Sequence, residues 1–189
     1  ELAERVGTIP GVVAVGAAAH LPLRGNACRG FSIEGRPVPP DGDGPGAAYT
    51  VACPGYFRAM GMPVLRGREF TAHDTLSSPG VVLINAALAK RYWPDEDPIG
   101  KRIVIGRKGE PNWLTIVGIV GNVRHWGLAR EIRPQLFRPY TQAAWPFMTV
   151  VVRTTAAPAG FAQAIRQQMA RVEPDRALSP PETMEEVVR

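Results

Sequence analysis

The chain has 189 residues, of which 45% are hydrophobic and 21% are charged, a balance that is typical of a globular domain and excludes a disordered protein. Its net charge is +5 at pH 7, from 22 basic and 17 acidic residues. Because the arginines are spread along the sequence, we interpret this charge as a solvated basic surface and do not expect nucleic-acid binding.

A short amphipathic helix is predicted at the N-terminus. Leu2, Val6 and Ile9 recur at helical spacing, and Pro10 and Gly11 end the pattern. After it we expect a buried strand over 12–19, an exposed turn-rich loop over 24–46 with a brief strand at 31–34, and a strand over 48–53.

A second helix is predicted directly after that strand. Proline suits the first turn of a helix and glycine suits the position just past its end, and here Pro54 and Gly61 bracket a segment of one to two turns. The segment would bury Tyr56, Phe57 and Met60.

The middle of the chain is predicted to be mostly strand with one helix. Asn85 is a good N-cap for that helix and Pro94 stops it, while Leu88 and Tyr92 share one face. Strands are expected over 81–84, 101–105, 113–120 and 135–140.

The C-terminal part is predicted to return to strand and helix. A strand over 147–154 precedes the longest helix, 158–172, whose apolar residues at 161, 165, 169 and 172 form one stripe. A last strand over 177–179 and a helix containing Met184 and Val187 are expected to follow.

This order predicts an α+β (mixed α/β) fold with two lobes. Both ends of the chain consist of helix and strand, so residues 1–63 and 143–189 are expected to form one βαβ-like lobe. Residues 64–142 would form an inserted, mostly-β lobe.

No segment is expected to span a membrane. Residues 6–23 carry no charge, but Pro10 and Gly11 break the stretch and its middle is only weakly hydrophobic. The chain starts without methionine and stops inside a predicted helix, so we expect it to be a piece of a longer protein.

The usual patterns of catalytic chemistry are missing from the sequence. His20, His73 and His125 do not have the spacing of metal ligands, and no Cys-x2-Cys occurs. His73 and Asp74 are the one acid–base-like pair, and a loop start or helix cap is the simpler interpretation. We therefore predict no catalytic, cofactor-binding or metal-binding residue.

Other motifs in the sequence also do not predict a binding or catalytic site. Gly100-Lys101 lacks the earlier glycine and the following hydroxyl residue of a phosphate-binding loop, and Gly118 and Gly121 lie in a strand-rich segment. Cys28 and Cys53 are interpreted as free or buried thiols, with one disulfide as the alternative.

A series of short motifs lies in order along nearly the whole chain, at 9–12, 54–61, 67–74, 82–85, 88–94, 97–101, 116–124, 134–140 and 152–154. In this order the motifs resemble the periplasmic core domain of MacB/FtsX-type ABC-transporter permeases, in particular the duplicated-permease branch of acidobacteria. Cys28, Cys53 and the loop over 24–46 lie outside the resemblance.

The resemblance implies a non-catalytic, extracytoplasmic domain of an inner-membrane protein that relays motion or contact in ATP-driven transport or efflux. The lobe of 1–63 and 143–189 would then be membrane-proximal and porter-like, with both chain ends on one side. The implied partners are flanking transmembrane helices and a cytoplasmic ATPase, and a periplasmic adaptor and a homodimer are compatible with it.

Two other functions remain open at this point. The domain would be an extracytoplasmic ligand- or protein-binding module without a transport role if it held a deep apolar pocket or a flat apolar patch. It would be an enzyme if a cleft joined His73 or His125 to a carboxylate.

Overall fold

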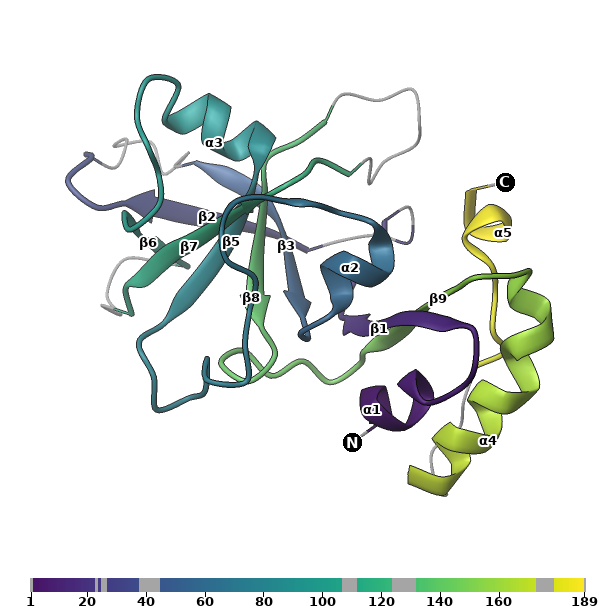
Figure 1. Cartoon of the computed structure of the whole chain (residues 1–189). Coiled ribbons are helices and arrows are strands. Elements are labelled where there is room, and N and C mark those ends of the chain that lie inside the picture. Colours follow the sequence, from purple (N-terminus) through teal and green to yellow (C-terminus); the bar gives the residue numbers. More distant parts are fainter. Residues whose placement is uncertain are drawn as a thin grey trace.

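The computed structural model has a mixed α+β fold, which confirms the predicted class (Figure 1). It describes residues 2–22, 24, 27–37, 45–106, 112–123, 132–172 and 179–188. The helices are α1 (Leu2–Gly7), α2 (Tyr56–Met60), α3 (Ala86–Tyr92), α4 (Ala162–Val172), α5 (Met184–Val188) and the 3₁₀ turn η1 (Pro158–Phe161); the strands are β1 (Val12–Ala18), β2 (Ala27–Ile33), β3 (Gly46–Ala52), β4 (Val64–Gly67), β5 (Val81–Asn85), β6 (Arg102–Ile105), β7 (Leu114–Val120), β8 (Gln135–Pro139) and β9 (Thr149–Thr154).

Six of the strands close into a small barrel. The sheet runs β2-β6-β7-β5-β8-β3, and β2 pairs again with β3. The two partners lie on opposite edges of β2: the N–H of Phe31 donates to Pro45 O beside β3 (2.8 Å), and Gly30 O accepts from the N–H of Gly106 beside β6 (3.0 Å). β4 and β1 attach outside this ring, to β7 and β3 respectively.

The barrel encloses one of two apolar cores. Because side chains alternate across a strand, every second residue of a barrel strand points inward. The inward residues form one cluster. Leu88 of α3 and Trp93, the residue directly after α3, also belong to it. Its other buried members are Phe31, Ile33, Ala47, Tyr49, Val51, Val82, Ile84, Ile103, Leu114, Ile116, Ile119 and Leu136.

Outside the ring, a two-stranded ribbon carries both ends of the chain. β1 and β9 pair antiparallel along their length, whereas the pairing of β1 with β3 has a single register pair, Ala18 and Ala52. α1 packs against both β1 and α4. Figure 1 shows α1, α4 and α5 gathered at this end of the molecule, away from the barrel and α3.

Most predicted elements are confirmed, and Asn85 caps α3 as expected, its Oδ1 accepting from the N–H of Leu88 at 3.0 Å. One prediction is wrong, and one strand was not predicted. Part of the expected loop is strand, because β2 begins at Ala27, and β4 was not expected at all. The predicted strand over 177–179 falls largely outside the described residues.

The division of the chain into two lobes at 63/64 and 142/143 stays a prediction. In the structure, β2 and β3, from the predicted terminal lobe, share the barrel with β5 to β8, from the predicted inserted lobe. Among the described residues, no helix is long and apolar enough to cross a membrane.

Candidate coupling site

α2 lies between the terminal ribbon and the barrel. It packs on β1 and β9 on one side and contributes to the core outside the barrel on the other. Tyr56, Phe57 and Ala59 are buried, and the ring of Phe57 lies 5.0 Å from that of Phe137 on β8. One short helix therefore contacts both parts of the molecule, and Figure 1 shows where α2 lies between them.

Glycines allow this close approach. Gly55, just before α2, has a φ of 85°, in the left-handed region, and a Cβ there would collide with Val15 O. In β1, a Cβ on Gly16 would collide with the backbone nitrogen of Tyr56. The start of α2 thus lies directly on the backbone of β1.

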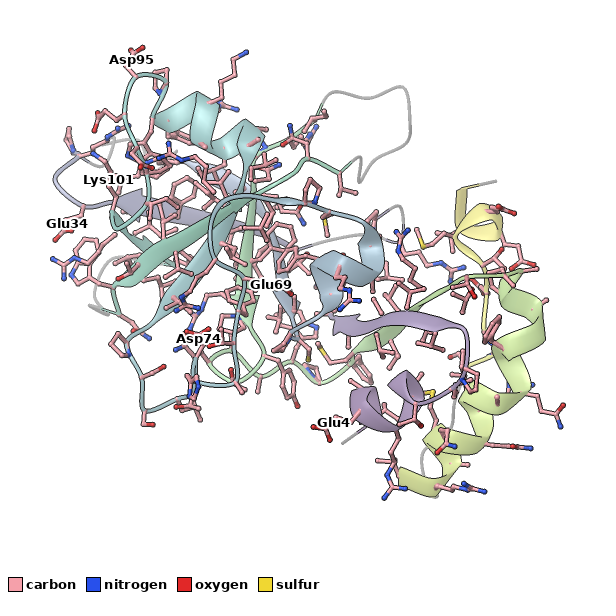
Figure 2. The ribbon with its side chains drawn as sticks, viewed as in Figure 1. Glu4, Glu34, Glu69, Asp74, Asp95 and Lys101 are labelled. Atoms are coloured by element: carbon pink, nitrogen blue, oxygen red, sulfur yellow. The ribbon has the colours of Figure 1, made fainter. Side chains whose placement is uncertain are left out.

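Two hydrogen bonds hold α2 at its ends. The N–H of Gly55 donates to Oε1 of Glu69 at 2.9 Å, which ties the start of α2 to the segment that leaves β4. Nε of Arg153, on β9, donates to Ala59 O at 2.9 Å. Glu69 lies on the barrel side of the helix and Arg153 on the ribbon side, and the position of Glu69 can be followed in Figure 2.

The segment after Glu69 is itself anchored. Phe70 is buried, and its ring lies 5.9 Å from that of Phe57. Asp74 is 4% exposed and accepts two hydrogen bonds of 2.8 Å from the guanidinium of Arg68. It also accepts from the N–H of Thr71 at 2.7 Å. The Arg68 guanidinium, assisted by Thr71, holds the pKa of Asp74 below its usual range.

A glutamine joins this segment to β5 and to the chain after β8. Oε1 of Gln142 accepts from the N–H of Val81 at 2.9 Å, and its Nε2 donates to Thr75 O, Ser78 Oγ and Pro79 O at 3.0 Å each. The hydroxyl of Thr141 also donates to Asp74 O. The path from α2 through Glu69 to the barrel is therefore fixed at each step.

The candidate acid–base pair does not form a reactive site. His73 is exposed, and the carboxylate of Asp74 points to Arg68 and Thr71, so the loop-cap interpretation fits the structure. His125 lies outside the described residues. Among the residues that the structure does describe, no group of three His, Cys, Asp or Glu side chains could hold a metal ion, and no disulfide joins Cys28 to Cys53.

The other sequence motifs have structural roles. Lys101 pairs with Glu96, and Gly100 has a φ of 83° in the preceding turn. Gly118 lies against Arg68 O and Gly121 against Pro63, so both permit close backbone approach. Sequence reasoning recognised the bracketed helix α2 but missed Glu69 and Arg153, whose partners are 14 and 94 residues away.

One family model matches most of the chain. Residues 3–168 match the family model described as MacB-like periplasmic core domain. None of the curated proteins compared matches the chain.

Three solved structures are similar. The periplasmic region of MacB from Actinobacillus actinomycetemcomitans is 13% identical with a TM-score of 0.60, covering 90% of this chain and 72% of that one. The extracellular domain of the noncanonic ABC-type transporter YknZ from Gram-positive bacteria is 18% identical with a TM-score of 0.58, covering 92% and 81%. A domain of a permease protein from Porphyromonas gingivalis is 16% identical with a TM-score of 0.54, covering 86% and 65%.

Proposed function

Because the chain belongs to the MacB-like periplasmic core domain family, we propose that it is a non-catalytic relay, passing motion driven by ATP from the membrane to the barrel. The domain is an extracytoplasmic part of an ABC-transporter permease, so transmembrane helices and an ATPase are its partners. Efflux, contact with a periplasmic adaptor and a homodimer in the whole transporter belong to the proposal.

The observation that carries this proposal is the double attachment of α2. A relay needs an element that cannot move without moving both of its neighbours. Gly55 is hydrogen-bonded to Glu69 on the barrel side, and Ala59 is hydrogen-bonded to Arg153 on the ribbon side. Since α1, α4 and α5 gather at the ribbon, we propose that the ribbon receives the motion from the membrane helices.

The test uses the full-length transporter with its ATPase. Both native cysteines are replaced, and a fluorophore is attached at Asp95→Cys. Asp95 lies in the exposed turn after α3, and Figure 2 shows it at the far end of the barrel from α4. We expect its signal to differ between the ADP state and the ATP–vanadate state. The double variant Glu69→Ala/Arg153→Ala should reduce this difference while ATP binding is unchanged.

The matched control is Asp97→Asn. Asp97 pairs with Arg66 at 2.6 Å, but the pair is exposed and takes no part in the two hydrogen bonds that hold α2. Its loss should leave the nucleotide-dependent signal intact. A signal at position 95 that never responds to nucleotide would contradict the relay and favour a binding module without a transport role.

A further inference from the structure

Two arginines and three aromatic rings gather on the inner side of β3 and β8. This group, here named the Tyr49 cluster, comprises His20, Arg29, Tyr49, Arg138 and Trp145. The Trp145 ring lies 5.2 Å from that of His20 and 6.3 Å from that of Tyr49. Tyr49 belongs to the barrel core, and Trp145 packs against that core from the connection between β8 and β9.

The two arginines supply the positive charge of the cluster. The guanidinium of Arg29 lies 5.9 Å from the centroid of the Tyr49 ring, and both arginines act electrostatically on the Tyr49 hydroxyl. Arg138 donates a hydrogen bond from its guanidinium to a backbone oxygen, Gln142 O, at 3.2 Å. Within the described part of the chain, no acidic side chain lies within ion-pair distance of either arginine.

Two polar atoms of the cluster are buried without a hydrogen bond. They are Nε of Arg138 and Nδ1 of His20. Buried polar atoms in folded proteins nearly always have a hydrogen-bond partner, because a polar atom that is desolvated and left unpaired is unfavourable. The same burial lowers the pKa of Arg138 and of His20. A donor that is buried, charged and short of acceptors is suited to an anion.

We propose that the Tyr49 cluster binds a small organic carboxylate whose body is flat and apolar. Guanidinium groups form strong, directional hydrogen bonds with carboxylates, and here Arg138 and Arg29 would supply them. The faces of Tyr49 and Trp145 would cover the apolar body. Trp145 lies in a connection and is only half-buried, so it is the side chain that turns aside on binding.

This site is separate from the relay. Neither Glu69 nor Arg153 belongs to it, and its elements are the start of β2, the inner faces of β3 and β8 and the segments around His20 and Trp145. Binding is therefore expected in the isolated domain, without ATP and without the membrane helices. Failure of the relay experiment would leave this proposal standing, and the reverse is also true.

The experiment compares benzoate with benzyl alcohol, which has a similar ring and no charge. Benzoate is titrated into the chain by calorimetry while the indole N–H signals are followed by NMR. We expect benzoate to bind at least about tenfold more tightly than benzyl alcohol. The Trp145 signal, assigned with Trp145→Phe, should shift, whereas the signals of Trp93 and Trp113 should not.

Variants separate the site from general effects. Arg138→Gln should weaken benzoate binding about tenfold or more, and Arg29→Gln, on the exposed side, should weaken it several-fold without affecting folding. Arg66→Gln is the control, because it removes an exposed arginine elsewhere on the sheet and should leave binding unchanged. Three outcomes would overturn the proposal. They are the absence of both binding heat and a Trp145 shift at about 10 mM benzoate, equal affinity for benzyl alcohol, and an equal loss of benzoate affinity in Arg66→Gln.

Discussion

At the scale of single residues, Gly16 is the position where the ribbon and α2 come closest. Gly16→Ala places a Cβ against the backbone nitrogen of Tyr56, which cannot move away as a flexible side chain would. We expect a loss of about 1–3 kcal/mol or more in the free energy of unfolding, measured by urea denaturation. Gly30→Ala is the matched control, since Gly30 is also in a strand and a Cβ there meets nothing within 4 Å. Equal stability of the two variants would contradict this packing.

Glu69 contributes to stability through one hydrogen bond. Glu69→Ala leaves the N–H of Gly55 without its acceptor in a partly buried position. We expect the free energy of unfolding to fall by about 1–3 kcal/mol. Asp97→Asn breaks an exposed ion pair and should cost at most about 1 kcal/mol. Thermal unfolding of the two variants side by side measures the difference, and an effect of Asp97→Asn as large as that of Glu69→Ala would refute it.

Asp74 makes stability depend on acid pH. Its pKa is lowered in the folded state by Arg68 and Thr71, so the unfolded chain takes up the proton first. The stabilisation is complete above the unfolded pKa of about 3.9 and disappears as the pH falls through the folded value. Because the pKa values of Glu34 and Glu96 are also lowered, the difference between the wild type and Asp74→Asn isolates this residue. That difference in melting temperature should shrink between pH 6 and about pH 3; a constant difference would be inconsistent with the pairing.

At the scale of elements, sequence patterns identified what is local. β5 and β7 are rich in Val and Ile and are buried, and α3 has a cap and a stop, so each was predicted close to its real bounds. β2 was largely missed because most of its first half is exposed and carries Cys, Arg and Gly instead of β-branched residues. β4 has four residues, all exposed, and so leaves no alternating pattern.

The helix α4 shows a limit of pattern reading. Its apolar stripe was predicted, yet none of its residues is buried, so the stripe is only partly covered in the structure. Helices gain most of their stability from packing such a face. We therefore expect amide hydrogens of α4 to exchange with solvent much faster than those of β5, whose residues are all buried. Hydrogen-exchange mass spectrometry measures this, and equal protection of the two elements would show that α4 is better held than its burial indicates.

At the scale of the whole molecule, closure of the barrel could not be read from the sequence. The pairing of β2 with both β3 and β6 joins residues far apart in the chain and leaves no mark on local periodicity. The same holds for the Tyr49 cluster, whose members come from five separate segments. Residue types and their spacing predicted most of the helices and strands, and only the topology brings the arginines and aromatic rings together.

The two predicted lobes raise the question of whether they unfold separately. The core outside the barrel contains Ala14 and Val151 of the ribbon, Phe57 of α2 and Phe137 of the barrel, so neither part keeps its packing when the other unfolds. We expect one cooperative unfolding transition in urea. Tryptophan fluorescence reports on the barrel, and a fluorophore on Val13→Cys, in a chain with both native cysteines replaced, reports on β1. The midpoints from the two probes should coincide. Gly16→Ala should separate the two midpoints by loosening the ribbon first. Two well-separated midpoints in the otherwise unchanged chain would mean that α2 does not couple the parts, and the relay would then lose its physical basis.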